Sequence, residues 1–443
     1  NIAHSLGSTP GMIIIRCLVG VHDWEVYHRS ANMFTPASQS LHLNEDHAAN
    51  TDSTVWNNTD PTSTQFTVGT NSNVNQNGHT YIAYIFAHDD ARFGANEDES
   101  VIKSGDFGSN GSSHGSVNLG WEPQWVLIKK IDGSGDDWFI FDTMRTFGTN
   151  GVSNKPIRAN SSATELSNYP YFYLTSNGFG WDGASLGGWN YIYTAIRRPH
   201  KPPNAGTEVF ETLSYSGSGG AIKRNTNILV DAVFSQRTNV DNPYALDRVR
   251  GGVAWLPINS SDQEGEQSSG LTEFGNNYID IAGGGGTINF LSKNYVLSMF
   301  KRAPGFMDVI AYEGDGNLNR TVPSSLSVPA ELAIVKRRDN AGSWLTYSKD
   351  IPSGYYLILN ATQAPGGYPF FGTQTAAGLV LSDAAAGTCN GSGEKYIAYL
   401  FASLPGISKL GSFSGTGYAI NVDCGFTNGA RFVLIKRTDA SGD

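Results

Sequence analysis

The stretch Tyr81–Ala87 reads YIAYIFA, and this apolar, tyrosine-led run returns three times along the chain. The later copies begin at Tyr191, Tyr295 and Tyr396, so that successive copies are offset by 110, 104 and 101 residues. We call it the Tyr run. Because a repeat at a nearly fixed period sets the architecture of the whole chain, this run decides how the sequence is divided.

Further motifs recur in a fixed order around the Tyr run. An apolar run that ends in basic residues, the basic run, has copies ending at Arg16, Lys130, Arg237, Arg338 and Arg437. An aromatic residue follows within eight residues in four copies, at Trp24, Trp138, Tyr244 and Trp344. A third run closes on asparagine, at Asn44, Asn160, Asn259 and Asn360. Turn residues separate the basic run from the aromatic residue, which is typical of a β-hairpin.

One more motif lies between each Tyr run and the next basic run, and places an aromatic residue just before glycine. We call it the glycine-signature strand, and its copies contain Phe107, Tyr215, Tyr312 and Phe413. Each repeat runs from this strand to the Tyr run, which divides the chain into repeats 1–93, 94–203, 204–303, 304–404 and 405–443. We expect the first repeat to lack its N-terminal strand and the fifth to be truncated. Since the chain starts at Asn1 and stops in mid-pattern, we expect it to be a fragment of something longer.

The composition of the repeats predicts the fold class. Their runs are short, rich in Val, Ile, Tyr, Phe and Thr, and separated by turn residues, which is typical of strands. Fully apolar runs alternate with half-polar ones, which indicates two sheets around one core. We therefore predict an all-β protein, a tandem array of about 100-residue β-sandwich domains. A parallel β-solenoid is the alternative, but its coils of about 20 to 30 residues are far shorter than this period.

The repeats should also superpose, with the same motif at the same strand position in each. Ile14, Ile128, Ile334 and Ile435 are expected in one strand position, and the Tyr runs form another strand of each repeat. The third repeat is expected to diverge, because Ser235-Gln236 replaces the usual aliphatic–lysine pair and tyrosine replaces tryptophan. Its surface is therefore expected to serve another role.

Charge and cysteine content exclude several classes of function. The 443 residues include 30 Lys and Arg against 40 Asp and Glu, and the net charge of −10 works against binding to nucleic acid. No apolar stretch approaches the ~18 residues of a membrane span, so we expect no membrane insertion. Cys17, Cys389 and Cys424 are odd in number and far apart, which rules out a disulfide framework. We interpret them as small buried hydrophobic residues.

Catalytic motifs and metal-binding spacings are weak in this sequence. It contains no nucleophile elbow, zinc-protease helix or phosphate loop, so we predict no catalytic residue, no cofactor and no enzyme activity. All nine histidines fall between His4 and His200. His42 and His47 flank Asn44-Glu45-Asp46 and could hold a divalent metal, but the equivalent loops of later repeats carry no histidine. We predict no metal site there, and leave open whether the His-rich N-terminal half binds a metal.

A ligand site on a repeat protein is expected where one copy departs from the others. The loop Asn177–Gly183 is such a departure, and it contains Trp181 next to Asp182. An exposed indole could stack on the face of a sugar while the carboxylate bonds its hydroxyls, so these two residues are the candidate glycan contact. The recurring tryptophans, by contrast, are expected to pack in the core.

The motifs resemble the tandem-repeat virion proteins of marine tailed phages, of the cyanophage and pelagiphage type. The resemblance is carried by Leu119–Lys129, Asp137–Arg145, Arg158–Ser162 and Tyr191–Arg198. It is strong in the first, second and fourth repeats and in the partial fifth, and weak in the third. It implies tail-fibre or tail-associated components built from lectin-like, jelly-roll-like sandwiches and located in the virion. It supplies no catalytic residue.

These inferences lead to three hypotheses of function. The first is a non-enzymatic virion structural protein, a segment of a tail fibre or similar appendage that spaces and presents contacts with host-surface polysaccharide. Its partners would be other virion proteins and further copies of itself, as a homo-oligomer and specifically a trimer. The second is a glycan-degrading tail enzyme on the same fold. The third is a capsid-decorating or filament-forming protein.

Overall fold

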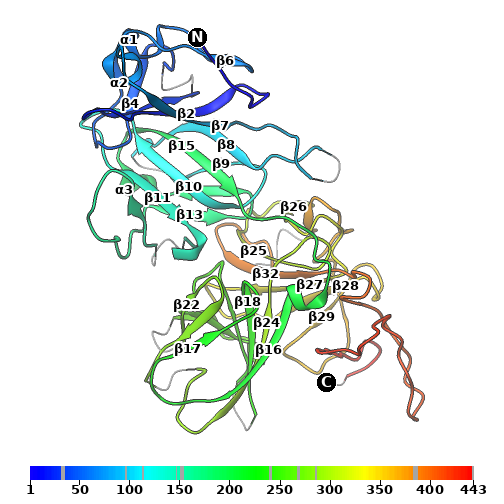
Figure 1. Ribbon diagram of the computed structural model, residues 1–443. Helices are drawn as coiled ribbons and strands as arrows, with labels where there is room; N and C mark the ends of the chain where they lie inside the picture. The colour runs from blue at the N-terminus through cyan, green and yellow to red at the C-terminus, as the bar shows by residue number, and fades with distance from the viewer. Residues whose placement is uncertain are drawn as a thin grey trace. The chain divides into compact units, whose positions relative to one another are not determined.

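Strands dominate the protein. The computed structural model describes residues 1–30, 35–94, 97–111, 114–145, 147–149, 154–238, 242–266, 270–284, 287–382 and 388–441. Strands hold 38% of the residues and helices 4%, so the prediction of an all-β fold is confirmed (Figure 1). The chain forms two compact units, one of residues 1–174 with 178–199 and the other of residues 175–177 with 200–443.

The first unit contains the first two predicted repeats. Repeat 1 consists of β1 (Ile2–Ala3), β2 (Pro10–Cys17), β3 (Trp24–His28), β4 (Gln39–His42), β5 (Asn50–Thr51), α1 (Ser53–Trp56), β6 (Gln65–Phe66), α2 (Ser72–Asn75) and β7 (Tyr81–Ala87). Repeat 2 consists of β8 (Ile102–Gly108), β9 (Gly115–Asn118), β10 (Pro123–Lys130), β11 (Trp138–Asp142), the 3-10 turn η1 (Thr143–Arg145), β12 (Ile157–Arg158), β13 (Phe172–Thr175), β14 (Gly178–Trp181), α3 (Gly183–Leu186) and β15 (Asn190–Arg197).

The second unit contains the third and fourth predicted repeats. Repeat 3 consists of the 3-10 turn η2 (Gly206–Glu208), β16 (Phe210–Ser216), β17 (Ile222–Asn225), β18 (Ala232–Arg237), β19 (Tyr244–Asp247), β20 (Ala254–Pro257), β21 (Gly265–Glu266), β22 (Leu271–Phe274), β23 (Tyr278–Ile281) and β24 (Asn294–Phe300). Repeat 4 consists of β25 (Met307–Glu313), β26 (Arg320–Pro323), β27 (Leu332–Arg337), β28 (Leu345–Ser348), β29 (Tyr355–Ile358), β30 (Gly366–Gly367), β31 (Gly378–Leu381) and β32 (Lys395–Phe401).

One strand order recurs in the larger sheet of every repeat. The Tyr runs are β7, β15, β24 and β32, as predicted, and each pairs antiparallel with the strand of the basic run. The orders are β8-β15-β10-β11-β12, β16-β24-β18-β19-β20-β21 and β25-β32-β27-β28-β29-β30 in repeats 2, 3 and 4. Repeat 1 has the order β7-β2-β3-β4-β5, without an outer neighbour for β7 among the described residues.

Each repeat also contains a smaller sheet. The smaller sheets are β1-β6, β13-β14-β9, β17-β23-β22 and β26-β31. In repeat 2 the residues between the two sheets form one aromatic cluster, in which Phe107 contacts Phe172, Phe179 and Trp181. In repeats 2, 3 and 4 residues of both sheets form a core within the repeat. In repeat 1 the core lies between the larger sheet, the helices α1 and α2, and Phe66 of β6.

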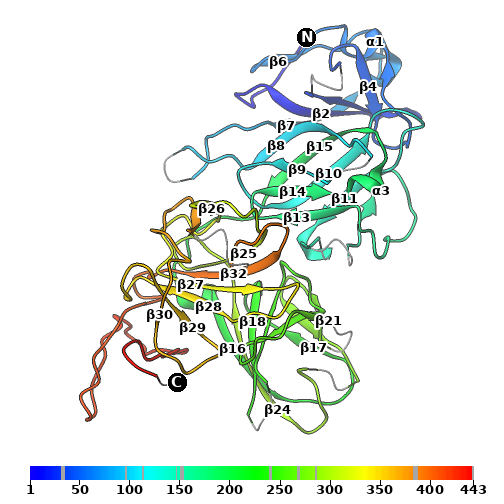
Figure 2. The same cartoon turned by 180° about the vertical axis from the view of Figure 1, so that it is seen from behind.

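The other face of the larger sheet packs against the neighbouring repeat of the same unit. In unit 1, Met12 and Ile14 of repeat 1 share a cluster with Leu127 and Trp138 of repeat 2. Figure 2 shows β2 and β7 of repeat 1 beside β8 of repeat 2. In unit 2, repeats 3 and 4 share a larger cluster that includes Ile334. The repeats are thus joined in pairs by a buried core and not strung as independent domains.

Equivalent hydrogen bonds cross the boundary between the paired repeats in both units. The indole of Trp138 donates from Nε1 to the carbonyl oxygen of His42 at 2.8 Å, and the indole of Trp344 donates to that of Pro257 at 2.9 Å. Both acceptors lie two residues before the asparagine that closes the run in the first repeat of the pair. The recurring tryptophan of repeats 2 and 4 therefore fastens its repeat to the one before it.

A buried lysine and a backbone hydrogen bond also cross the boundary between the paired repeats, at equivalent positions in both units. Lys129 donates to the carbonyl oxygen of Asp46 at 2.7 Å, and Lys336 reaches that of Ser261 at 3.4 Å. Both carbonyls lie two residues after the closing asparagine. The backbone bonds Ala49 N to Ile131 O and Glu264 N to Arg338 O, both 2.9 Å, are equivalent as well. The two units are built on one plan.

The closing asparagine has a local structural role. In three repeats its side-chain oxygen accepts a hydrogen bond from the backbone N–H of the recurring tryptophan, from Trp24 to Asn44, from Trp138 to Asn160 and from Trp344 to Asn360, over 2.8 to 3.0 Å. This bond satisfies a backbone donor at the start of a strand, where the ladder has not yet begun. It explains why the aromatic and asparagine motifs occur together.

Two expectations about strand positions are corrected. Ile14 and Ile334 face the fourth residue of their Tyr runs, Tyr84 and Tyr399, whereas Ile128 faces the third residue of its own. A shift of one residue moves a side chain to the opposite face of a sheet, so Ile128 belongs to the core of its own repeat. Ile435 lies in no strand and is 61% exposed. Residues 405–441 contain no strand.

The residues that distinguish the third repeat differ in exposure, since Ser235 is buried, Tyr244 is half-buried and Gln236 is exposed. Tyr244 packs edge-on against Trp255. The buried Arg250 is paired with Asp247 at 2.6 Å and with Glu264 at 3.0 Å. Tyr399 of repeat 4 donates to Asp247 at 2.7 Å, so this network joins the two repeats of unit 2.

The helices of the described residues are single turns. Asp52 caps α1 and Asn71 caps α2, each by accepting a hydrogen bond from a backbone N–H two residues on. Within the described part of the chain, every helix is too short and too polar to cross a membrane.

Candidate functional site

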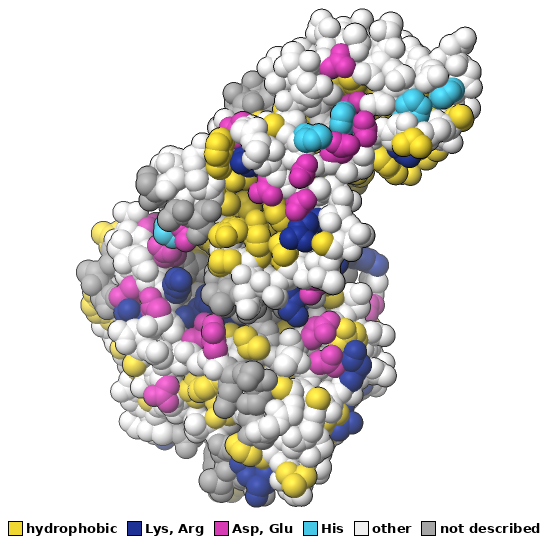
Figure 3. All heavy atoms as spheres, turned by 90° about the vertical axis from the view of Figure 1, so that its left-hand side faces the viewer, with side chains coloured by type: hydrophobic (Ala, Val, Ile, Leu, Met, Phe, Trp, Pro, Cys, Tyr) yellow, Lys and Arg dark blue, Asp and Glu magenta, His cyan; other side chains and the backbone are white. Residues whose placement is uncertain are grey.

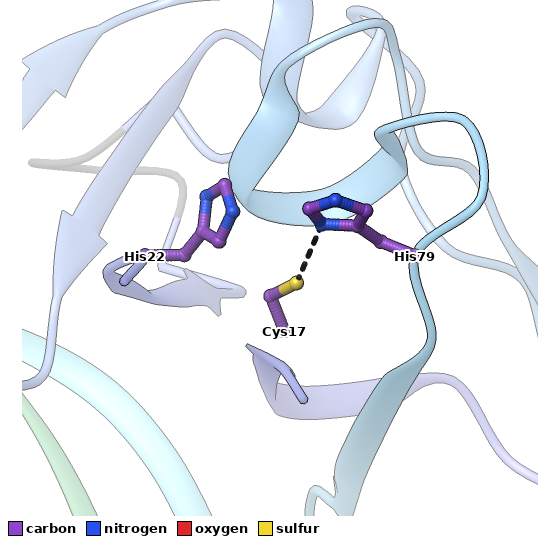
Figure 4. A group of neighbouring side chains, drawn as sticks. All are labelled: Cys17, His22 and His79. Carbon is purple, nitrogen blue, oxygen red and sulfur yellow. Dashed lines mark hydrogen bonds between the residues drawn. The ribbon is translucent and has the colours of Figure 1, made fainter. Parts of the chain in front are cut away.

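Three side chains with metal-ligand chemistry meet at one end of repeat 1. Cys17 is the last residue of β2, His22 lies in the turn before β3, and His79 comes two residues before β7 (Figure 4). One ligand atom from each lies within 4.8 Å of the others. We call this group the Cys–His cluster. A backbone bond from Leu18 N to Thr80 O, 2.8 Å long, joins the two strands that hold it.

The geometry of the Cys–His cluster fits a transition metal. The Cys17 Sγ and His79 Nδ1 atoms are 3.4 Å apart, close to the ~3.5 Å between S and N ligands of tetrahedral Zn²⁺ that follows from its bond lengths. His22 Nδ1 lies 3.2 Å from Asn73 Oδ1, and this contact fixes the ring and leaves its other nitrogen to act as a ligand. One thiolate and two imidazoles suit Zn²⁺, with a fourth position for water or another ligand.

A second group of possible metal ligands in repeat 1 consists of Asp23, His42 and Glu45. His42 Nε2 is 3.1 Å from the buried Glu25 carboxylate, and Nδ1 is 3.8 Å from Asp23. The hydrogen bond to Glu25 raises the pKa of His42, with partial burial opposing. Both ring nitrogens face carboxylates, so a protonated His42 itself supplies the positive charge that this group needs. It is better explained as an ion-pair network than as a metal site.

His47, the other histidine singled out from the sequence, pairs with Glu45 at 2.7 Å and is largely exposed. With His42 it borders a hollow of about 270 Å³ that is lined mainly by β4 and the loop after it. The structure thus brings His42 and Glu45 together, as the sequence suggested. The Cys–His cluster was missed, because its third ligand, His79, lies 57 residues after His22, and a single Cys and His five residues apart do not mark a metal site.

The structure does not present Trp181 as a sugar contact. The indole is 7% exposed, and it stacks on Phe107 with the ring centroids 4.3 Å apart. Gly115, the cross-strand partner of Trp181, also lies against the ring, and an added Cβ there would come within 2.2 Å of it. Asp182 is more open and lies 3.7 Å from His114. The indole is buried in the core of its repeat, so it does not offer an open face to a sugar ring.

An aromatic hollow lies elsewhere in repeat 2, between the ends of both sheets. Its volume is about 280 Å³. Its lining residues are Lys130, Asp136, Phe139, Tyr169, Tyr171, Phe172, Leu186, Trp189 and Tyr191. Trp189 is 41% exposed, and the Lys130 ammonium lies 4.0 Å from its ring centroid. In Figure 3 hydrophobic side chains gather beside charged ones on this side of unit 1, at the level of α3 and β11 in Figure 1.

The aromatic hollow combines stacking surfaces with hydrogen-bonding groups. Tyr169 and Tyr171 meet edge to face with centroids 4.4 Å apart. Burial and the charge of Asp136 raise the pKa of Tyr169, so its hydroxyl keeps its proton and can donate. An ammonium and a carboxylate stand at the same opening. Such a combination fits a polar ligand with one apolar face, such as a sugar.

Comparison with known proteins gives one match. The chain fits the profile of a family described as a domain of unknown function, DUF7483, over residues 1–199 and 205–443. The chain belongs to this family. No curated protein and no solved structure matches it.

The two DUF7483 stretches follow the division of the structure. The first ends at residue 199, where the first compact unit ends, and the second begins at residue 205, close to the start of the second unit. Each stretch holds one pair of repeats with the cross-repeat tryptophan bond. The paired arrangement is therefore the natural structural unit of this DUF7483 protein.

Proposed function

We propose that this protein is a non-enzymatic virion structural protein, a segment of a phage tail fibre or similar appendage that spaces and presents contacts with host-surface glycans. The observation that carries the proposal is the aromatic hollow beside Trp189, since stacking surfaces and hydrogen-bonding groups together are what a carbohydrate needs. The sequence resemblance supports the virion location and a homo-oligomer, expected to be a trimer. Paired repeats with shared cores provide rigid modules for such an appendage.

In this proposal Trp189 provides the stacking face. A pyranose ring laid on the exposed part of the indole buries its C–H face, while its hydroxyls reach the exposed carboxylate of Asp136. Tyr169 and Tyr171 form one wall of the aromatic hollow. The hollow is large enough for one or two sugar rings and is open to solvent, so a longer polysaccharide can extend from it.

Glycan binding can be tested directly on the 443-residue chain. We expect binding to at least one member of an array of bacterial capsular and O-antigen polysaccharides, and loss of more than tenfold in affinity in Trp189→Ala. Tyr355→Ala is the matched control, because Tyr355 is 46% exposed and belongs to the other unit. It should bind like the parent protein.

Absence of binding across the array, or equal losses in both variants, contradicts the glycan proposal. New reducing ends during incubation would instead indicate the glycan-degrading enzyme. Labelling of purified phage particles with an antibody to the chain tests the virion location, and label on the head and not on the tail would favour the capsid-decorating protein.

We also propose a transition-metal site at the Cys–His cluster, as a second function of repeat 1. The metal would join the end of β2 to the residues just before β7, and so anchor an edge strand. Since the ligands must be deprotonated, binding should release protons and weaken in acid. The expected metal is Zn²⁺, with Co²⁺ as a spectroscopic substitute.

The metal proposal predicts one equivalent of Zn²⁺ by elemental analysis after loading and dialysis. The Co²⁺ form should show a sulfur-to-metal charge-transfer band that Cys17→Ser removes. Cys424→Ser is the matched control, because Cys424 is a free thiol far along the chain and should leave the band unchanged. Loading at less than one-tenth of an equivalent, or a band removed by the control variant, overturns this proposal.

A further inference from the structure

One pair of positions recurs at the end of the larger sheet, and its chemistry changes from repeat to repeat. In each repeat the last residue of the basic-run strand lies opposite the first tyrosine of the Tyr run. In three repeats the residue two places before that tyrosine contacts this last residue. The pairs are Cys17–His79, Lys130–Trp189 and Arg337–Glu394. A residue pair of the Cys–His cluster, one of the aromatic hollow and an ion pair therefore occupy equivalent positions.

In repeat 4 the cation at this position is neutralised by its own repeat. Arg337 forms an ion pair with Glu394 and another with Asp339, the latter at 2.8 Å. Both carboxylates lie just outside the strands β27 and β32, at the same end of the sheet. The charge of Arg337 is therefore balanced without a ligand.

In repeat 2 an aromatic ring replaces the carboxylate. Trp189 stands where repeat 4 has Glu394, and the Lys130 ammonium lies 4.0 Å from its ring centroid. Among the described residues, this ammonium forms no hydrogen bond and no ion pair. Asp136 lines the same hollow, but its carboxylate accepts a hydrogen bond from the backbone N–H of Asp137, at 2.8 Å. The Lys130 charge is thus left without an anion.

Burial makes the missing anion significant. Lys130 is 8% exposed, and a lysine is rarely so deeply buried unless its charge is paired. A cation–π contact replaces only part of the water that the ammonium has lost. Because the side chain lines the aromatic hollow, an anion that enters the hollow can pair with it. Such a pair is screened less by water and salt than one on an open surface.

We propose that the ligand of the aromatic hollow is an acidic sugar, a pyranose that bears a carboxylate or a sulfate ester, and that Lys130 selects it. This inference rests on the glycan binding proposed above and names the class of glycan. A lysine ammonium is a point charge without a preferred plane, so it suits either anion. The anionic group lies at the edge of the sugar ring, so the ring can pack against the aromatic side chains while the anion meets the ammonium.

The net charge of the chain makes this selection local. At −10 the protein as a whole repels acidic polymers, so general electrostatic attraction does not explain their binding. Binding of an acidic glycan must then depend on a cation held at the site itself. Lys130 is that cation, and Asp136 at the exposed side of the hollow is left to bond a hydroxyl.

Chemical removal of the anion tests the class of ligand. The probes are the array polysaccharides that bind the 443-residue chain, before and after reduction of their carboxylates to alcohols or removal of their sulfate esters. We expect the bound polysaccharides to contain acidic sugars. One of the two treatments should lower affinity more than tenfold, and the effective treatment identifies the anion. Strongest binding to neutral polysaccharides, or affinity unchanged by both treatments, overturns this inference and leaves the glycan proposal intact. Absence of binding to every polysaccharide overturns both.

Variants of Lys130 test the residue. Lys130→Met keeps the aliphatic stem beside Trp189 and removes the charge, so it should lose more than tenfold in affinity for the untreated polysaccharide and little for the treated one. Lys130→Arg keeps the charge and should retain most of the affinity. The matched control is Lys223→Met in the other unit. Its ammonium also lies near an aromatic ring, 3.7 Å from the Tyr278 centroid, but it is paired with Asp280. This variant should bind like the parent protein.

The pattern of losses separates the role of Lys130 from that of Trp189. Trp189→Ala should weaken binding of treated and untreated polysaccharide alike, whereas Lys130→Met should weaken only the untreated form. Raising the salt concentration from about 50 mM to about 500 mM should weaken binding by the parent protein more than by Lys130→Met. Equal losses in Lys130→Met and Lys223→Met, or a loss in Lys130→Met that is the same for both forms of the polysaccharide, overturn the assignment of Lys130.

Discussion

The indole Nε1 of Trp344 donates a hydrogen bond to the carbonyl oxygen of Pro257 at 2.9 Å, across the boundary between two repeats. Trp138 makes the equivalent bond to His42 in the other unit. Both indoles are at most 1% exposed, so the bond is made away from water. A single side chain therefore joins two sheets that are separated by about 90 residues of sequence.

Trp344→Phe should destabilise the second unit by about 1 to 3 kcal/mol more than Trp255→Phe. Both changes remove the same atoms, but the indole nitrogen of Trp255 has no hydrogen-bond partner in the structure. Only the Trp344 variant leaves the Pro257 carbonyl unsatisfied. Chemical denaturation monitored by fluorescence measures the difference, and equal losses would contradict the assigned role of the bond.

Ile334→Ala should cost about 2 to 5 kcal/mol, because the side chain lies in the core shared by repeats 3 and 4 and its removal leaves a cavity. Ile435→Ala should cost less than about 0.5 kcal/mol, since Ile435 is 61% exposed and lies in no strand. Denaturant midpoints of the two variants test this contrast. A large loss in Ile435→Ala would show that the fifth repeat is folded in solution.

As the pH falls, unit 1 should lose stability at a higher pH than unit 2. Burial lowers the pKa of His28 to about 4, and the side chain is 1% exposed. The unfolded chain binds a proton near pH 6.5 and the folded protein does not, so stability falls as the pH drops from about 6.5 towards 4. His28 alone accounts for about 2 kcal/mol by pH 5. Unit 2 contains only His200 of the nine histidines.

Calorimetry at pH values from 7 to 5 measures this difference. The unfolding temperature of unit 1 should begin to fall at a higher pH than that of unit 2. His28→Gln should flatten its pH dependence, and His47→Gln, at an exposed site, should not. Parallel behaviour of both units, or a flat profile in the parent protein, would contradict the prediction.

Alkaline pH should stabilise the protein through Lys129 and Lys336, the two lysines that are 0% exposed. Desolvation lowers the pKa of Lys129 and of Lys336 to about 8, against the 10.5 of an exposed lysine. Between about pH 8 and 10 the unfolded chain holds protons that the folded chain has released, so stability rises with pH. Lys129 contributes about 2 kcal/mol by pH 10.

The slope of unfolding free energy against pH from 8 to 10 measures the lysine effect. Lys129→Met removes the titrating group and should reduce that slope, whereas Lys155→Met, at an exposed site, should leave it unchanged. A slope that is unaffected by Lys129→Met would mean that this ammonium keeps its proton throughout.

The sequence predicted the motifs of the repeat better than their spatial relations. The Tyr runs are strands, as predicted. The aromatic residue and the closing asparagine recur together because they share a hydrogen bond within one repeat, as from Trp344 to Asn360. The assignment of Ile128 to the position of Ile14 was wrong by one residue. In the first repeat the final basic position is occupied by Cys17, so alignment on the basic residue shifts the strand.

The sequence by itself determined the all-β class and the order of the recurring motifs along the chain, because these depend on local composition and on a repeating pattern. The tertiary structure alone decided which faces were buried. It joined the repeats in pairs, placed Trp181 in the core and left Trp189 open. It also brought Cys17, His22 and His79 together. Contacts between residues far apart in the chain depend on how sheets pack, and no local pattern encodes that packing.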